Sequence, residues 1–172
     1  MSVRDHIPNE ARRPALIAVD WGTSALRGWL LSNDGAVLDR RASRQGIMAV
    51  ADGDFDAAYR AFTADWRAEG PALPALSSGM IGSRQGWAEA PYVACPAGFT
   101  DIADRFVPVG ASDASLKIVP GLSWQAPDLW IDVMRGEETQ LFGALMDGEH
   151  DGLFSLPGTH SKWARVEAGR VA

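Results

Sequence analysis

The stretch that most constrains the fold runs from residue 15 to residue 31 and reads ALIAVDWGTSALRGWLL. The apolar run from Leu16 to Val19 is typical of a short strand buried on both faces. Gly22 follows, where the backbone can turn sharply and approach a ligand closely. From Leu26 onward, apolar and other residues alternate with the period of a returning strand. The stretch therefore predicts a strand, a tight turn and a second strand.

The turn in this unit has the chemistry of an anion site beside a divalent cation. Asp20 ends the first strand, and Thr23 and Ser24 bring two hydroxyls and several backbone N–H groups to the bend. Such amides and hydroxyls hold phosphate oxygens, and a carboxylate holds Mg²⁺, often through water. An ordinary β-hairpin with a polar turn is the alternative that these residues alone leave open.

The next elements predict an antiparallel meander followed by a helix. Residues 33–35, Asn-Asp-Gly, are a tight-turn signal, and residues 36–44 then predict a third strand. Neither Gly-x-Gly-x-x-Gly nor a Gly-Lys-Ser/Thr loop is present, which disfavours the two common nucleotide-binding entries. Residues 54–69 predict a helix capped by Asp54 or Asp52. Its apolar stripe is a core face made of Phe55, Ala58, Tyr59, Phe62 and Trp66.

A glycine-rich loop, residues 79–87, follows the short apolar strand predicted at residues 73–78. Ligands of open α/β sheets lie beyond the carboxyl ends of strands, so this loop is a candidate substrate site. Arg84 can pair with a carboxylate and Trp87 can cover an apolar face. The alternative is a surface loop with an exposed arginine. The candidate residues are Met80, Gly82, Ser83, Arg84, Gln85 and Trp87.

Residues 88–130 give weaker signals because five prolines divide them into short pieces. We expect a short helix at residues 99–106, strands at residues 116–119 and 129–133, and a buried, unreactive Cys95. A helix then begins near Glu137 and Glu138, and we expect its buried side to consist of Leu141, Phe142 and Leu145. Carboxylates in a first helical turn are favoured by the helix dipole, which explains both residues without any function. The functional alternative is that one of them accepts a proton from a substrate hydroxyl.

The segment from residue 152 to residue 169 repeats the opening pattern. A short apolar strand meets a bend at Gly158-Thr159, and a returning strand begins at Trp163. Two strand–turn–strand units with Gly-Thr at the bend therefore lie near the two ends of the chain.

Composition limits the class of protein. The chain has 172 residues, of which 47% are hydrophobic and 22% charged, which fits a globular domain. A net charge of −6 disfavours a nucleic-acid partner. The single cysteine favours a reducing compartment, and the sequence holds no long apolar run for a membrane. We expect a cytoplasmic protein whose residues 1–14 form a flexible tail rather than a secretory signal.

The order and spacing of six segments resemble the 2-dehydro-3-deoxygalactonokinase family of the actin-like ATPase and sugar-kinase superfamily. The segments are DWGTS at residue 20, GMIGS at 79, GW at 86, APY at 90, MRGEETQ at 134 and PGTHSKW at 157. The resemblance implies an α/β, ribonuclease-H-like domain with a mixed sheet that begins as a three-strand antiparallel meander flanked by helices. It implies a first domain at residues 15–150 and the start of a second, nucleotide-binding domain at residues 151–172, where the chain ends.

By this resemblance, the protein transfers the γ-phosphoryl group of MgATP to the 6-hydroxyl of 2-dehydro-3-deoxygalactonate. Asp20 would hold Mg²⁺, and Glu137 or Glu138 would accept the hydroxyl proton. Arg84 and Arg135 are candidates for the substrate carboxylate. The ATP and phosphate site would comprise Asp20, Gly22, Thr23, Ser24, Arg27, Gly158, Thr159, His160 and Lys162.

Two departures from the superfamily pattern leave alternatives open. Relatives in the wider superfamily carry aspartate at the catalytic base, whereas this chain has adjacent glutamates. The second phosphate loop lacks the usual acidic residue and has His160 and Lys162 instead. A kinase for another sugar or sugar acid, and a non-catalytic module without a second domain, are the alternatives. The expected partners are a sugar acid and ATP, and a homodimer is left open.

Overall fold

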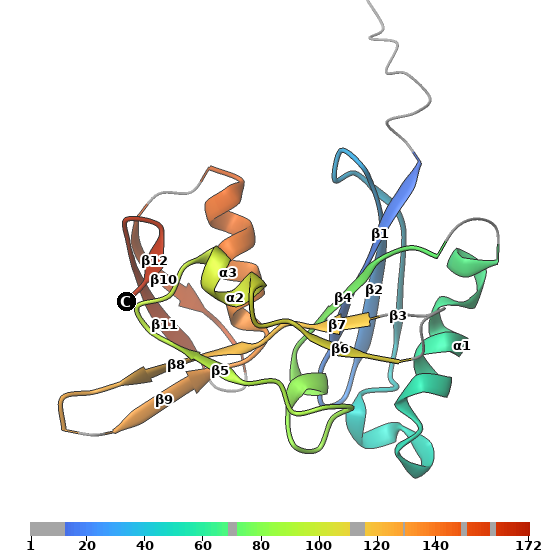
Figure 1. The fold of residues 1–172 in the computed structure, drawn as a ribbon, viewed down its shortest axis with the longest axis horizontal. Helices are drawn as coiled ribbons and strands as arrows, with labels where there is room; N and C mark the ends of the chain where they lie inside the picture. The colour runs from blue at the N-terminus through green and yellow to red at the C-terminus, as the bar shows by residue number, and fades with distance from the viewer. Residues whose placement is uncertain (1–12, 69–71, 111–115, 129, 149–150, 159–160) are drawn as a thin grey trace, which may run out of the picture.

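The computed structural model describes residues 13–68, 72–110, 116–128, 130–148, 151–158 and 161–172. Three sheets form among these residues, one with six strands and two with three strands each (Figure 1). The strands are β1 (Pro14–Trp21), β2 (Leu26–Ser32), β3 (Val37–Ser43), β4 (Ala75–Ser78), β5 (Tyr92–Ala94), β6 (Val107–Val109), β7 (Leu116–Ile118), β8 (Gly121–Gln125), β9 (Ile131–Met134), β10 (Gly152–Leu156), β11 (Lys162–Glu167) and β12 (Arg170–Val171). The helices are α1 (Phe55–Arg67), α2 (Phe99–Ala103) and α3 (Glu137–Met146), with short 3₁₀ turns η2 (Ile47–Ala49), η3 (Ala51–Gly53) and η4 (Met80–Gly82).

The six-stranded sheet has the order β3-β2-β1-β4-β7-β6. Strands β1, β2 and β3 pair antiparallel in sequence order, which confirms the predicted meander. Strand β4 instead lies parallel to β1, and β7 lies parallel to β4. The sheet is therefore mixed, as expected, and the carboxyl ends of β1 and β4 meet at one edge, where Asp20 is level with Ser78.

Helix α1 covers one face of this sheet, and its sequence explains why. The Asp54 carboxylate accepts the N–H of Ala57, so it caps the helix as predicted. The predicted apolar stripe packs into the first core, with Tyr59 fully buried and Phe62 partly buried. Strand β2, the middle strand of the meander, lets the helix approach this closely only because residue 28 is glycine. A Cβ there would lie 2.7 Å from the Phe62 ring.

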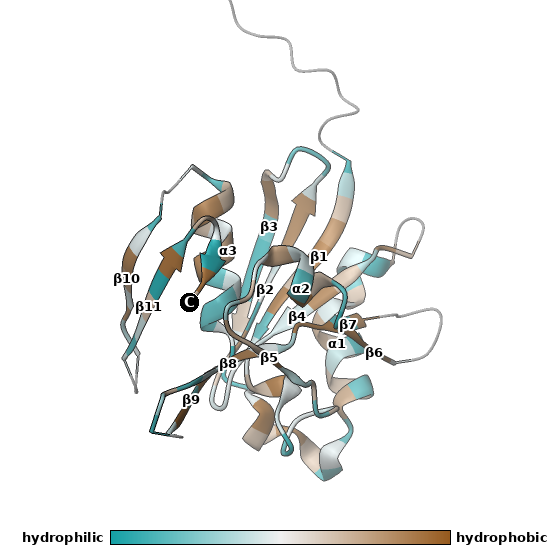
Figure 2. Cartoon of the chain, turned by 60° about the vertical axis from the view of Figure 1, so that its left-hand side comes forward, coloured by the Kyte–Doolittle hydropathy of each residue, from teal (hydrophilic) through white to brown (hydrophobic). Residues whose placement is uncertain are grey.

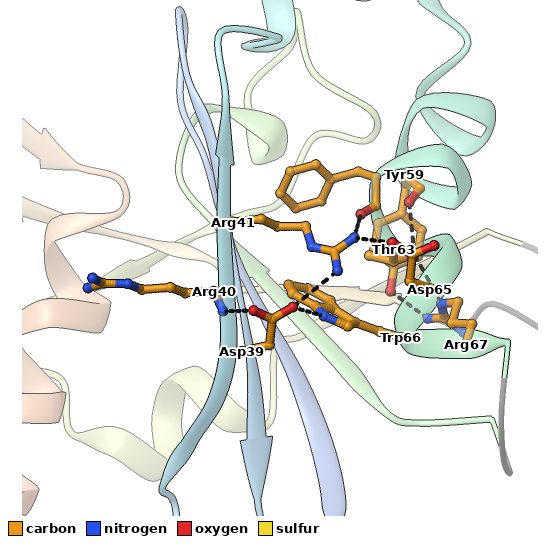
Figure 3. Close-up of polar contacts among 9 residues, drawn as sticks. Asp39, Arg40, Arg41, Tyr59, Thr63, Asp65, Trp66 and Arg67 are labelled. Carbon is orange, nitrogen blue, oxygen red and sulfur yellow. Dashed lines mark hydrogen bonds and ion pairs between the residues drawn. The ribbon is translucent and has the colours of Figure 1, made fainter.

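Polar contacts also fix α1 to β3 (Figure 3). The Trp66 indole Nε1 donates to Asp39 Oδ2 at 2.7 Å, and this bond lowers the pKa of Asp39 further than any other contact. The Arg41 guanidinium lies 4.0 Å from the centre of the Trp66 ring and donates to the backbone oxygen of Phe62. These contacts attach the C-terminal half of α1 to β3. The N-terminal half is held by the burial of Phe55, Ala58 and Tyr59 in the first core.

A second core holds the remaining elements together, on the other side of the sheet from α1 (Figure 1). Leu141 and Phe142 of α3 are buried there with Ala164 and Val166 of β11, and Leu145 is partly buried against them. Strand β8 contributes Leu122 from the neighbouring sheet. The predicted apolar side of α3 is therefore confirmed.

The structure differs from the predicted elements between residues 88 and 130. The helix expected at residues 99–106 stops at Ala103, and the chain enters β6 soon afterwards. Strand β6 contains Pro108, which the sequence treats as a breaker. It is tolerated because β6 is an edge strand, where a missing N–H costs no ladder bond. Strands β5 and β8 were not predicted, since runs of three to five residues carry little periodic signal.

Candidate functional site

The site is built where β1 and β4 end side by side. Asp20 is level with Ser78, and Gly79 follows at φ +94°. A Cβ on Gly79 would lie 2.9 Å from the Trp21 carbonyl oxygen and 3.2 Å from Asp20 Oδ1. Glycine is required here for its conformation and for its size, because the backbone of the loop passes directly against the Asp20 carboxylate.

A second glycine brings α3 to the same place. Gly136 has φ +104°, and a Cβ on it would lie 3.3 Å from the Cα of Gly79. The two glycine backbones therefore touch, one at the end of β4 and one at the start of α3. A cavity of about 270 Å³ opens beside them. Its polar lining is Asp20, Ser78, Gly136, Thr139 and Gln140, and its apolar lining is Ala18, Val19, Trp29, Leu76 and Val119.

Asp20 is held by a cross-strand partner. Arg27 Nη1 lies 2.9 Å from Asp20 Oδ2, and the two side chains are 54% and 37% exposed. Such an exposed pair contributes little to stability, so the carboxylate can exchange its partner at small cost. No cluster of three metal-ligating side chains occurs in the described part of the chain. A lone, accessible carboxylate still fits Mg²⁺, which keeps most of its waters and takes further ligands from phosphates.

The first bend is braced from behind by residues 46–48. The amide of Ile47 donates to the Gly22 oxygen at 3.0 Å, and the amide of Met48 donates to the Thr23 oxygen at 3.3 Å. A Cβ on Gly46 would lie 2.3 Å from that Thr23 oxygen. The carbonyl oxygens of Gly22 and Thr23 thus already accept backbone N–H groups of the protein, while the Thr23 and Ser24 residues are exposed. This arrangement suits a bend that presents hydroxyls outward.

The two glutamates at the start of α3 have different surroundings. Glu137 Oε2 accepts the N–H of Arg135 at 3.0 Å, and Glu137 is partly exposed. Glu138 is fully buried, and its Oε2 accepts the N–H of Gly136 at 2.7 Å. The Thr139 hydroxyl lies 3.2 Å from its other oxygen. Burial raises the pKa of Glu138 to about 7, against the opposing effect of these hydrogen bonds.

Helical spacing explains this difference. Glu138 shares the i, i+3, i+4 face with Leu141 and Phe142, which is the face buried in the second core. Glu137 is three residues before Gln140, which lines the cavity. Neither carboxylate is among the residues that line the cavity, although Glu137 lies on the side of the helix nearer to it.

Arg135 connects the loop at residues 79–87 with the start of α3. Its Nη2 donates to the Ala90 oxygen at 2.8 Å, and its guanidinium lies 4.3 Å from the centre of the Tyr92 ring. A Cβ on Gly82 would lie 2.7 Å from its Nη1. Its Nε and Nη1 are buried without a hydrogen-bond partner in the described structure. Such unpaired donors are costly, so this arginine is a strong candidate for an anionic partner.

The other residues predicted in this loop lie in different environments. Arg84 Nε pairs with Glu89 at 3.0 Å, and the Arg84 side chain is 86% exposed. The Trp87 ring lies 6.0 Å from that of Tyr59 and packs against the first core. Met80 and Gly82 form the 3₁₀ turn η4. The Ser83 hydroxyl accepts the N–H of Gln85, an exposed residue.

The second bend is only partly described. Gly158 is exposed, and Thr159 and His160 lie outside the described residues. Lys162 begins β11 and forms an ion pair with Asp132 of β9. The predicted phosphate-binding lysine therefore has a carboxylate partner in this structure.

Sequence reasoning did not select Ser78, Thr139 and Gln140 as cavity residues. Ser78 had a usable signal, since it is the last residue of a strand predicted to end at the site. Thr139 and Gln140 had a weaker signal, since they directly follow the two candidate bases in the first turn of α3. The contact between Gly79 and Gly136 had none, because the two residues are 57 positions apart in sequence.

Together, the mixed sheet and the cavity at its carboxyl edge define an α/β protein with a candidate ligand site bounded by a strand end and a helix N-terminus. None of the described helices is both long and apolar enough to cross a membrane.

Comparison with known proteins identifies the family. The family model for 2-keto-3-deoxy-galactonokinase matches residues 20–172, so the chain belongs to this family. It is 46% identical over 158 residues to a probable 2-dehydro-3-deoxygalactonokinase from Rhizobium meliloti (strain 1021). It is 38% identical over 155 residues to the 2-dehydro-3-deoxygalactonokinase of Escherichia coli (strain K12). Each alignment covers 90% of this chain and 50% of the relative.

A solved structure supports the same family assignment. A Sinorhizobium meliloti protein assigned as a 2-dehydro-3-deoxygalactonokinase superposes with a TM-score of 0.80 at 42% identity. The match covers 91% of this chain and 51% of that one. The family predicted from the six sequence segments is confirmed, and the chain spans about half the length of the relatives it matches.

Proposed function

We propose that this chain supplies the substrate-binding half of a kinase that transfers the ATP γ-phosphoryl group to the 6-hydroxyl of 2-dehydro-3-deoxygalactonate. The observation that carries the proposal is a cavity lined by Asp20 and Gly136, with Gly79 packed against both of these residues, in a chain of this family. Phosphoryl transfer needs positioning and charge neutralisation more than covalent chemistry. A carboxylate and a helix N-terminus at one cavity, with an exposed hydroxyl bend three residues beyond the carboxylate, meet those needs.

The first bend would bind the phosphates. Thr23 and Ser24 would donate hydrogen bonds to phosphate oxygens, and Arg27 would release Asp20 and turn to an anion. Mg²⁺ would be held at Asp20 through water and would neutralise charge on the transferring group. Gly22 allows the phosphates to approach the bend, and Gly158, Thr159, His160 and Lys162 would contribute from the second bend.

Glu137 is the better candidate for the base. It is partly exposed on the side of α3 nearer to the cavity, so it can accept the proton of a substrate hydroxyl. Glu138 instead serves to order the helix start, because both of its oxygens are engaged inside the protein. Its raised pKa is expected of any buried carboxyl and does not by itself indicate catalysis.

Arg135 is the better candidate for the substrate carboxylate. Its two unpaired buried nitrogens favour an anionic partner, whereas Arg84 points into solvent beside Glu89. Met80, Gly82, Ser83 and Gln85 would shape the loop around the sugar chain, and Trp87 would support it from the core side. We further propose a ribonuclease-H-like domain at residues 15–150 and the start of a second, nucleotide-binding domain at residues 151–172.

The test joins this chain to the half of the Rhizobium meliloti relative that lies outside the match and measures ADP release. We expect turnover with 2-dehydro-3-deoxygalactonate and MgATP, and a weaker response to other sugar acids. Glu137→Gln should lower kcat roughly 10²–10⁴-fold with little change in the KM for ATP. Arg135→Met should raise the KM for the sugar acid. Loss of turnover in Glu138→Gln but not in Glu137→Gln would transfer the base to Glu138, and absence of ADP release with every sugar acid would refute the kinase.

One observation favours a second candidate, a module that does not catalyse on its own. The chain spans about half of each relative, so about half of each relative's polypeptide has no counterpart in it. Calorimetry of the 172-residue chain with MgATP distinguishes the two. Absent or millimolar binding supports the module, and micromolar binding with turnover excludes it.

A further inference from the structure

An apolar surface lies on the opposite side of the molecule from α1, across two of the sheets. We call it the tryptophan face, and its members are Trp124, Trp130, Val133, Leu153 and Trp163, which are 41%, 60%, 39%, 63% and 67% exposed. All five line one open pocket of about 460 Å³. Figure 2 shows hydrophobic stretches in β9, the second strand of the hairpin that carries part of this face. Large tryptophans grouped in this way are unusual on a solvent-exposed surface.

The strand register explains why these side chains point outward. In the sheet β10-β11-β12, Ala164 and Val166 face α3 and are buried. Trp163 and Leu153 lie on the opposite face, because they alternate with the buried positions along β11 and β10. A three-stranded sheet with one face packed and apolar side chains on the other is half of a layered structure.

The face has a preformed shape. Lys162 of β11 pairs with Asp132 of β9, so an ion pair links the hairpin to the second sheet at the edge of the pocket. The rings of Trp124 and Trp130 lie 6.5 Å apart in an edge-to-face arrangement. Ordered aromatic groups around a concave apolar surface are typical of the centre of a protein interface.

The length of the relatives indicates what covers this face. The chain matches 50% of the Escherichia coli and Rhizobium meliloti relatives and 51% of the solved Sinorhizobium meliloti chain. Each relative therefore carries about as much polypeptide again, which this fold must accommodate against some surface. The tryptophan face lies on the two three-stranded sheets and is concave, apolar and open, whereas one face of the six-stranded sheet is occupied by α1.

We propose that the tryptophan face is the docking surface for the polypeptide that makes up the other half of this family. Trp163 and Leu153 are the central anchors, with the β8–β9 hairpin as one wall. The proposal depends on family membership and on this surface, and it holds whether or not the kinase assignment is correct.

The experiment co-expresses the tagged 172-residue chain with the half of the Rhizobium meliloti relative that lies outside the match. We expect the two to co-purify in equal amounts. The double variant Trp163→Thr/Leu153→Thr should reduce the recovered partner more than tenfold. Threonine suits a strand, and both positions are more than half exposed, so the variant should keep its thermal unfolding midpoint. Val37→Thr is the matched control, since Val37 is 56% exposed on the distant edge strand β3.

Four outcomes would overturn the proposal. The first is that the relative's other half does not associate with the unaltered chain. The two would then not co-purify as separate polypeptides, and joining them would not protect the β11 amides from hydrogen exchange. The second is equal recovery with the double variant. The third is a dimer of the 172-residue chain that the double variant dissolves, which would show that a second copy covers the face. Quenching of tryptophan fluorescence by ADP in the isolated chain would likewise show a small-molecule pocket instead.

Discussion

Replacement of Glu138 by glutamine should make the protein more stable above pH 7 and leave its stability near pH 4.5 almost unchanged. Burial raises the pKa of this carboxyl from 4.5 to about 7 in the folded protein. One pKa unit corresponds to about 1.4 kcal/mol, so the ionised carboxylate costs the folded state about 3 kcal/mol. The protonated form carries no such cost.

The sign follows from proton binding. The folded state binds the Glu138 proton more tightly than the unfolded state, so the favourable contribution is fully present below pH 4.5. It is lost as the pH rises through about 7. Glutamine keeps an oxygen that can accept the N–H of Gly136 and has no ionisation, so Glu138→Gln should not show this loss.

Urea denaturation from pH 4.5 to pH 8.5 measures the effect. The difference in unfolding free energy between Glu138→Gln and the unaltered chain isolates this residue, because the other acidic groups titrate in both. We expect the difference to grow by about 3 kcal/mol over that range. Val37→Thr is the control, since it changes no ionisable group and lies on the exposed edge strand β3, so its difference should not vary with pH. A difference for Glu138→Gln that is constant with pH, or larger at low pH, would refute the reasoning.

Three further predictions concern stability and reactivity. Gly79→Ala places a Cβ in a strained backbone at φ +94° and should cost roughly 1–3 kcal/mol in urea denaturation, whereas Gly143→Ala, with open space around it, should not destabilise α3. Trp66→Phe removes the 2.7 Å bond to Asp39 and should cost about 1–2 kcal/mol, and an unchanged denaturation midpoint would contradict this. Cys95 is only partly buried, not fully buried as expected, and this burial still raises its pKa, so a disulfide reagent at pH 8 should modify it more slowly than it modifies free cysteine; equal rates would count against this effect.

The elements with strong local signals were predictable from the sequence. The meander, α1 with its Asp54 cap and the buried side of α3 follow from turn residues, capping and periodicity, which act within a few residues. The missed strands β5, β6 and β8 are short, and their pairing depends on partners far away in sequence. Pro108 was taken as a breaker because nothing local reveals that its strand lies at a sheet edge.

The site was predictable in its residue types but not in its assembly. Asp20 and the first turn of α3 were identified from their positions in strand and helix. Their common cavity depends on Gly79 and Gly136, whose backbones pack within about a methyl group of each other. A single sequence gives the flexibility of each glycine but not the identity of its neighbour, so this contact required coordinates.

The adjacent glutamates show how one short segment can separate two tasks. A rotation of about 100° along a helix takes Glu138 into the core beside Leu141 and leaves Glu137 partly exposed near the cavity. A pair of glutamates can therefore place one carboxyl as a buried acceptor for the N–H of Gly136, which lies against Gly79, while the other is partly exposed and accepts the N–H of Arg135 with one oxygen. We propose that this second carboxyl meets the substrate hydroxyl. If this division is correct, Glu138→Asp should disturb both the geometry of the cavity and the stability of the fold, because a side chain one methylene shorter cannot reach the same N–H. Glu137→Asp should alter only turnover.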